Sequence, residues 1–165
     1  MTAGGVRVRP AVDGDAGELL TVQRAAFVAE AQRYGDPFLP PMREDLDAVR
    51  AVLTDPAVVV LVAATASGRL VGGVRVRLDG DVGHVGRLAV APDRQREGIG
   101  TALLTALEEA LPPSVHRLAL FTGGRSTATV ARYERAGYVR VQREPSVDDR
   151  GVPLAHLEKE LRPPA

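Results

Sequence analysis

Apolar and polar residues alternate along this chain with two different periods, and the change of period divides it into strands and helices. Alternation at every second position and continuous β-branched runs predict strands, whereas apolar residues three and four positions apart predict core-facing helices. The expected strands are residues 6–9, 58–64, 70–78, 82–90, 117–122, 138–143 and 153–161. The expected helices are residues 15–31, residues 43–53, a helix that starts at residue 99, and residues 127–136.

Turn and cap residues set the boundaries of these elements and indicate how they connect. We expect Asp13 to cap the first helix, Gly137 to follow the end of the last one, and residues 35–41 to form a proline-rich loop. Successive hairpins in the first half and a strand–helix–strand crossover in the second predict an α/β (α+β) fold with a mixed, mostly antiparallel sheet. Since no linker is long enough to divide the chain, we expect one domain spanning residues 1–165.

Composition narrows the class of protein without identifying it. The 165 residues are 45% hydrophobic and 25% charged, which is typical of a soluble globular protein. Basic and acidic residues number 21 each, so the chain has no broad electrostatic field for nucleic acid or an anionic membrane. The lack of cysteine excludes disulfides, thiolate metal sites and a cysteine nucleophile. With no long apolar run or signal-like N-terminus, we expect a cytoplasmic protein.

Residues 90–104 carry the most informative pattern: an apolar strand, a polar loop and a helix that begins on two glycines. From Ile99 onward the apolar side chains recur with helical spacing, as on a core-facing stripe. Gly98 and Gly100 have no β-carbon, so a ligand can approach the backbone closely. The first-turn N–H groups and the positive end of the helix dipole favour an anion, typically a phosphate. The segment therefore predicts a pyrophosphate site.

Three kinds of phosphate-binding loop start a helix with glycine, and the residues distinguish them. A dinucleotide fingerprint requires a third glycine where this chain has Leu103, and it would open a βαβ unit rather than follow a hairpin. A P-loop requires Gly-Lys-Ser/Thr, which occurs nowhere in the sequence. Residues 95–100 (QREGIG) match, at every defined position, the Gln/Arg-x-x-Gly-x-Gly/Ala loop of the GCN5-related N-acetyltransferase (GNAT) superfamily, which the flanking residues also resemble.

A second segment, residues 121–138, carries the same resemblance. It is similar to the superfamily's other signature, Asn-x-x-Ala-x-x-Leu-Tyr-Glu-x-x-Gly-Phe/Tyr, with Tyr133 at the first tyrosine. Two positions depart from that pattern: Ser126 replaces the asparagine and Arg132 the apolar residue before the tyrosine. Serine offers one hydroxyl rather than the two donors of an amide, which weakens one cofactor contact. The resemblance extends more faintly over almost the whole chain, which we identify as a member of the GNAT superfamily.

The resemblance implies a twisted sheet of about six to seven strands with about four helices, splayed where the fourth and fifth strands meet. The pantetheine of acetyl-CoA would enter there like an added strand, bound by backbone groups, and no metal is implied. N–H groups of residues 95–101 would hold the pyrophosphate, and Arg94 and Arg96 could reach further phosphate oxygens. The implied cofactor-binding residues are Leu88, Ala89, Val90, Gln95, Arg96, Glu97, Gly98, Ile99, Gly100, Thr101 and Ser126.

The implied reaction is direct attack of a free amine on acetyl-CoA, giving an amide and the CoA thiolate without a covalent enzyme intermediate. Tyr133 holds the general-acid position beside the sulfur. A phenol of pKa about 10 facing a thiol of roughly 8.5 would stabilise the developing charge by hydrogen bonding as much as by full transfer. His84 matches the position where many relatives carry glutamate, so it is the candidate general base; an ordinary solvent-facing strand histidine is an equal interpretation.

The sequence does not specify the acceptor. Glu30, Tyr34 and Asp36, around the first loop, could bind its ammonium group or could simply form a solvated loop. We expect a small-molecule or peptide amine, not nucleic acid or a membrane, and the exposed strand edges would permit a homodimer. Two other functions stay open. One is a catalytically weak or inactive CoA-binding sensor or interaction module of the same fold. The other is a nucleotide-binding protein that ATP or NAD, but not CoA, would stabilise.

Overall fold

The computed structural model describes residues 2–3 and 5–163, which form two compact units. Unit 1 consists of the described part up to Arg77 together with Gly86–Leu111. Unit 2 consists of Leu78–Val85 together with the described part from Pro112 onward. Two neighbouring strands, β4 (Leu70–Asp79) and β5 (Val82–Val90), pass from one unit into the other.

The sheet of unit 1 has the strand order β1-β2-β3-β4-β5. Its other strands are β1 (Thr2–Ala3), β2 (Val6–Pro10) and β3 (Val58–Thr65). β3 pairs antiparallel with both β2 and β4, and β1 pairs antiparallel with β2. Val62 and Val71 on these strands are fully buried, as is Leu103 on the helix that packs against them. These side chains form the core of unit 1, as the apolar pattern predicted.

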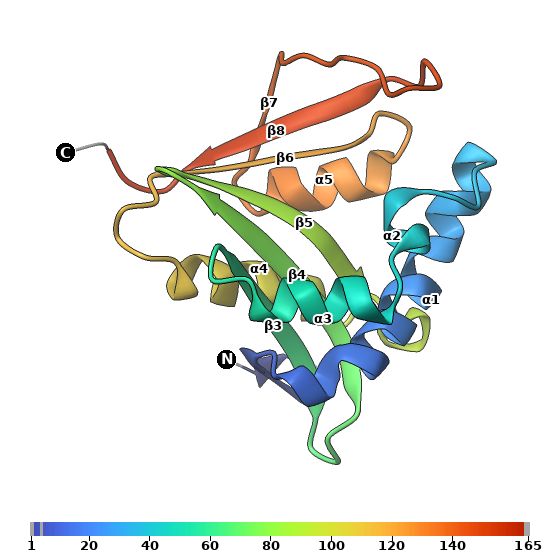
Figure 1. Ribbon diagram of the computed structural model, residues 1–165. Helices are drawn as coiled ribbons and strands as arrows, with labels where there is room; N and C mark the ends of the chain where they lie inside the picture. Colours follow the sequence, from blue (N-terminus) through green and yellow to red (C-terminus); the bar gives the residue numbers. More distant parts are fainter. Residues whose placement is uncertain (1, 4, 164–165) are drawn as a thin grey trace. The chain divides into compact units, whose positions relative to one another are not determined.

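Helices cover both faces of this sheet. They are α1 (Ala16–Tyr34), α2 (Pro40–Arg43), α3 (Leu46–Thr54) and α4 (Ile99–Ala110), with short 3₁₀ turns η1 (Asp13–Asp15) and η2 (Pro92–Arg94). A β-carbon on Gly72 would lie 3.1 Å from Leu103 of α4, and one on Gly73 would lie 2.6 Å from Leu19 of α1. Successive strand residues point to opposite faces, so α1 and α4 pack on opposite sides of β4 (Figure 1).

Unit 2 contains the crossover of the predicted fold. Its other elements are β6 (Arg117–Gly123), α5 (Thr127–Arg135), β7 (Val139–Val141) and β8 (Leu154–Glu160), in the strand order β5-β6-β8-β7. β5 and β6 run parallel over three residue pairs, from Val82 opposite Arg117 to His84 opposite Ala119. β8 pairs antiparallel with β6 and with β7. Leu118 is fully buried in the core of this unit.

The predicted mixed, mostly antiparallel sheet is confirmed, and all seven predicted strands occur within two residues of their expected bounds. The two-residue strand β1 and the short helix α2 are additions to the expected set. Gly137 follows α5 in a left-handed conformation (φ +96°), as expected for a residue just beyond a helix end. In the described part of the chain, no helix is long and apolar enough to span a membrane.

The predicted cap of the first helix was wrong. Asp13 begins the 3₁₀ turn η1, and the carboxylate that organises this helix start belongs to Asp15. Asp15 accepts a hydrogen bond from the Val12 N–H at 2.8 Å and two from the Arg9 guanidinium at 2.7 and 3.0 Å. The hydrogen bonds from Arg9 hold the pKa of Asp15 below its usual range. Because the deciding contact comes from Arg9 on the preceding strand, the local sequence could not show which of the two aspartates organises the helix start.

The second predicted helix was also wrong at its start, because two helices occupy its region. Pro40 stands in the first turn of α2, where its missing N–H costs nothing, although the sequence predicted a loop there. Glu44 is extended and ends that turn. The Asp45 side chain then accepts from the Ala48 N–H at 2.8 Å and starts α3. The second helix therefore starts after the Asp45 cap, not at Arg43 as the apolar pattern predicted.

Candidate functional site

The loop that follows β5 has an unusual backbone. Arg96 and Gly98 both adopt left-handed conformations, with φ +65° and +81°. Glycine takes such angles freely, whereas an arginine does so at a cost of order 1–2 kcal/mol. The two residues turn the chain abruptly from η2 into α4, all within unit 1. The loop is therefore held in a defined, partly strained shape ahead of the helix.

The start of α4 presents backbone donors. Its N-cap is Gly98, which has no side chain to accept from the first turn, and that turn reads Ile99-Gly100-Thr101 without an acidic residue. The first helical hydrogen bond, from the Ala102 N–H to the Gly98 carbonyl, is 3.0 Å long. The N–H groups before it have no acceptor within the helix itself. This end of α4 is chemically suited to a phosphate.

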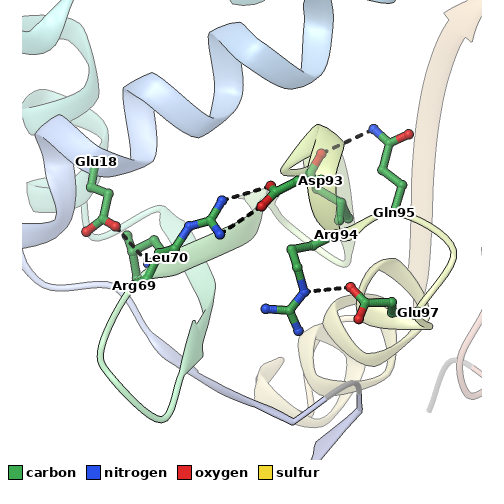
Figure 2. Close-up of polar contacts among 8 residues, drawn as sticks. Glu18, Arg69, Leu70, Asp93, Arg94, Gln95 and Glu97 are labelled. Carbon is green, nitrogen blue, oxygen red and sulfur yellow. Dashed lines mark hydrogen bonds and ion pairs between the residues drawn. The ribbon is translucent and has the colours of Figure 1, made fainter.

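Two ion pairs brace the loop, as Figure 2 shows. Arg69, in the turn before β4, donates two hydrogen bonds to Asp93 of η2 at 2.9 and 2.8 Å. These bonds hold the pKa of Asp93 below its usual range. Arg94 Nε donates to Glu97 at 2.6 Å, and the phosphate contact of Arg94 stays a prediction. The loop is thus supported by contacts on the neighbouring turn and within itself.

Two further features connect the loop to the end of β5. Gln95 Nε2 donates to the Val90 carbonyl at 3.3 Å, which bridges the strand end and the loop. Ala89 and Val90 have buried side chains. A ligand at this strand end would therefore meet backbone rather than these side chains. The structure accordingly brings the predicted residues 88–90 and 95–101 together in unit 1.

Tyr133 lies on α5 of unit 2 and is almost completely buried, with 5% of its surface exposed. Its ring meets that of Tyr138 edge to face, with centroids 5.4 Å apart. Burial raises the pKa of Tyr133 to about 12, and the charge of Arg132 opposes this only in part. The hydroxyl is therefore firmly protonated at neutral pH and can act as a hydrogen-bond donor. Ser126, the N-cap residue of α5, is fully buried in the same unit.

His84 lies on the part of β5 that belongs to unit 2, with about half of its side chain exposed. Its Nε2 is 3.8 Å from Asp79 Oδ2. Its neighbours Gly83 and Val85 are buried, so the strand turns His84 to the more open face. A water molecule could reach the imidazole, as a general base requires, and the role of His84 stays a prediction.

The predicted acceptor residues lie at the end of α1 and in the turn after it. Glu30 accepts from Arg33 at 2.5 Å, and Asp36 accepts from the Phe38 N–H at 2.9 Å. Tyr34 is buried. These contacts give Glu30 and Asp36 roles in the local fold of unit 1, and their contact with an acceptor stays a prediction.

The structure also contains a charged cluster that the sequence did not predict. Glu44, between α2 and α3, accepts from Arg87 Nε of β5 at 2.8 Å and from Arg75 Nη2 of β4 at 3.0 Å. Gln23 of α1 donates to the same carboxylate at 2.9 Å. Burial alone would raise the pKa of Glu44, but the bonds from Arg87 and Gln23 and both cationic charges outweigh it and hold the pKa below its usual range. We call Glu44, Arg75 and Arg87 the Glu44 cluster.

Comparison with known proteins tests the predicted family of this chain. The family model of the acetyltransferase (GNAT) domain matches residues 37–161, which include both the loop before α4 and Tyr133. The chain belongs to the GNAT acetyltransferase family. The predicted superfamily and the predicted class of enzyme, an N-acetyltransferase, are both confirmed.

Two curated relatives are similar to this GNAT acetyltransferase in sequence. It is 30% identical over 166 residues to S-(2-succino)cysteine N-acetyltransferase of Bacillus subtilis, an alignment that covers 94% of this chain and 96% of the relative. It is 38% identical over 98 residues to mycothiol acetyltransferase of Clavibacter sepedonicus. That second alignment covers 58% of this chain and 32% of the relative, so the chain matches only about a third of its length.

Solved structures confirm the GNAT fold. The PaiA N-acetyltransferase of Thermoplasma acidophilum, crystallised with coenzyme A, has a TM-score of 0.78 at 16% identity and covers 98% of this chain. All of that neighbour's chain is covered. The ribosomal-protein-S18-alanine N-acetyltransferase of Escherichia coli has a TM-score of 0.77 at 17% identity, with 97% of this chain and 96% of the neighbour covered. At these identities the likeness concerns the fold.

Proposed function

We propose that this GNAT acetyltransferase transfers an acetyl group from acetyl-CoA to the primary amine of a small molecule. The observation that carries the proposal is the glycine-capped start of α4, which follows a braced loop with the GNAT pyrophosphate motif. The relative that aligns along nearly its whole length is named for S-(2-succino)cysteine, a small-molecule acceptor. The PaiA neighbour holds coenzyme A, which supports the choice of donor.

The donor would bind mainly through backbone groups. In this proposal residues 88–90 bind the thioester and pantetheine as an added strand would, and the N–H groups of residues 95–101 bind the pyrophosphate. The side chain of Arg96 adds a cation beside the phosphates, and the Ser126 hydroxyl offers one further contact. Since the loop is already braced by Arg69 and Asp93, little ordering remains to be done when acetyl-CoA binds.

Tyr133 would assist departure of the CoA thiolate. Full proton transfer from a phenol of pKa about 12 to a thiolate of roughly 8.5 is uphill by about 5 kcal/mol. We therefore assign Tyr133 a hydrogen bond to the sulfur that strengthens as negative charge develops there. Burial of the ring makes that hydrogen bond stronger than it would be in water, since fewer water dipoles compete with it.

The attacking amine must first lose a proton. For an ordinary alkyl ammonium this costs roughly 4–5 kcal/mol at neutral pH. We propose that His84 receives the proton through water, because its imidazole is half exposed and a water molecule can reach it.

The replacement Tyr133→Phe tests the proposal. We expect turnover to fall by about one to three orders of magnitude while the dissociation constant for CoA stays within about twofold of wild type, because the lost hydroxyl acts on the leaving group. Thiol release across a panel of amines measures turnover, and calorimetry measures CoA binding. Tyr138→Phe, which keeps the neighbouring ring, is the matched control and should retain near-normal turnover. Unchanged turnover in Tyr133→Phe would remove this residue from the mechanism.

A CoA-binding module without catalysis is the second candidate. Ser126 in place of the family's asparagine and His84 in place of the strand glutamate are the observations that favour it. The wild-type protein separates the two functions. Tight CoA binding without thiol release, for every amine tested, would support the module and contradict the enzyme.

A further inference from the structure

The Glu44 cluster has more positive than negative charge. Two guanidinium groups face one carboxylate, and a third arginine, Arg24, donates to the backbone carbonyl of Glu44 at 2.7 Å. Exposed fractions of the three clustered side chains are 15% for Glu44, 21% for Arg75 and 24% for Arg87. Burial, followed by repulsion from Arg87, lowers the pKa of Arg75 even though Glu44 opposes it. A second anion would relieve this imbalance.

The two arginines also line a cleft. It is a small cleft of about 20 Å³ between α1, α3 and the sheet of unit 1. Apart from Arg75, Arg87 and Gln23, its walls are aliphatic: Leu19, Val49, Val52, Leu53, Val60 and Val74. Small-molecule sites commonly combine an apolar lining with a few convergent polar groups. The lining of this cleft suits a carboxylate and the few apolar atoms next to it.

Arg87 connects the cleft to the donor site. It precedes Leu88, the first residue proposed to bind the acyl-pantetheine end of acetyl-CoA, and adjacent α-carbons are about 3.8 Å apart. Arg87 is also held with φ +54°, a left-handed conformation that costs of order 1–3 kcal/mol and persists where surrounding contacts hold it. The bond to Glu44 is such a contact. Strain of this kind clusters at ligand-binding positions.

We propose that the acceptor amine carries a carboxylate, and that Arg87 and Arg75 bind this carboxylate in the aliphatic cleft. The proposal rests on the proposed function and names its substrate class. A guanidinium matches the planar geometry of a carboxylate, and two of them around one site leave donors beyond those that Glu44 engages. The aliphatic walls then contact the apolar atoms next to the carboxylate. The rest of the acceptor lies outside the cleft, and its amine attacks the thioester beside Leu88.

Matched acceptors test the proposal with the full-length protein. The panel contains amino acids with aliphatic, thioether and acidic side chains, each with its primary amide and its decarboxylated amine, assayed for thiol release at saturating acetyl-CoA. We expect the best acid to exceed its amide at least tenfold in kcat/KM. Arg87→Gln and Arg75→Gln should each raise KM for the acid by 10- to 100-fold and change KM for the amide by less than about threefold. A preference for amides or decarboxylated amines would overturn the proposal.

Arg77→Gln, on the same strand as Arg75, is the control variant. Arg77 pairs with Asp55 at 3.0 Å and is about half exposed, so its replacement should leave the ratio of acid to amide unchanged. Loss of acid and amide activity in equal measure in the Arg75 and Arg87 variants would indicate a structural role and overturn the proposal. If either variant unfolds, Glu44→Gln decides. Removing the competing carboxylate should lower KM for the acid by about 3- to 10-fold, and an unchanged or raised KM contradicts the proposal.

Failure of the proposed function has a different readout. A protein that does not bind CoA in calorimetry, or binds it and acetylates no amine, contradicts acetyl transfer itself, and the acceptor proposal is overturned with it. Turnover that is measurable but indifferent to the carboxylate contradicts the acceptor proposal alone.

Discussion

Two helices of unit 1 begin in opposite ways. At the start of α3, Asp45 is extended and its side chain accepts from the Ala48 N–H at 2.8 Å, with Asp47 adding negative charge in the first turn. At the start of α4, the cap is a left-handed glycine, Gly98, and the first turn has no acidic residue. Both helices carry the same dipole and the same surplus of N–H groups.

This contrast indicates where an external anion can bind. The chain itself supplies the acceptor and the negative charge at α3, so this end contributes to stability and has little affinity left for a phosphate. The first turn of α4 supplies neither, and the loop before it is braced by ion pairs that involve Arg69 and Arg94. The start of α4 therefore has N–H groups without an acceptor in the helix, and we propose that the phosphates of acetyl-CoA accept from them.

The largest effect should come from giving α4 the charge that α3 already has. Thr101→Asp places a carboxylate in the first turn, where it would compete with and repel the pyrophosphate that we propose binds there. We expect CoA affinity to fall by 10- to 100-fold, about 1.4–2.7 kcal/mol. Stability of the free protein should stay equal or rise by up to about 1 kcal/mol, because the carboxylate suits the helix dipole. Calorimetry and thermal unfolding measure the two effects.

Thr105→Asp is the matched control for this variant. It introduces the same charge one turn further along α4, where the influence of the helix end has faded and solvent screens the charge. CoA affinity in this variant should fall by less than about threefold. Equal losses in the two variants would mean that the start of α4 does not bind the pyrophosphate.

A smaller effect is expected from changing the cap of α4. Gly98→Ala forces a β-carbon into a left-handed conformation and should destabilise the protein by about 1–2 kcal/mol in urea unfolding. Gly17→Ala is the contrasting variant, since α1 is right-handed there and a β-carbon would meet nothing within 4 Å. That replacement should stabilise by about 0.4–1 kcal/mol. If Gly98→Ala and Gly17→Ala change stability in the same direction, the left-handed conformation at Gly98 does not require glycine.

The smallest effect is expected at α3. Asp45→Ala removes the side chain that accepts from Ala48 and should cost about 1 kcal/mol of stability. CoA affinity should remain within about twofold of wild type, because the donors freed at α3 are not part of the proposed donor site. A marked loss of CoA affinity in this variant, measured on folded protein, would show that the start of α3 also contributes to CoA binding.

Most of the fold was accessible from the sequence because its signals are local. The alternation of residues 70–78 predicted β4 and the helical stripe predicted α4, although the first five residues of β4 are buried on both faces of the sheet. The predictions failed where a contact from elsewhere decided the outcome. Asp15 rather than Asp13 organises the first helix because Arg9 is opposite it, and the Asp45 cap divides the second predicted helix.

The candidate site was also predictable only where its residues are close together in the sequence. The loop of residues 95–101 is contiguous and its motif is specific, so it was found from the residues alone. The Glu44 cluster joins residues 31 and 43 positions apart, on a loop and on two strands, and no period or motif connects them. A partly buried arginine on a strand such as Arg75 is indistinguishable in sequence from the solvent-facing Arg77. Only the fold separates the two.

The left-handed Arg96 has a consequence for engineering this enzyme. Asparagine tolerates φ near +65° better than arginine, so Arg96→Asn should relieve up to about 1 kcal/mol and raise the melting temperature by a few degrees. Directed evolution for heat resistance in the absence of ligand would therefore enrich that replacement. It would also discard a cation from the loop proposed to bind the phosphates. Selection in the presence of acetyl-CoA would keep the arginine, since the ligand then contributes to the stability being selected.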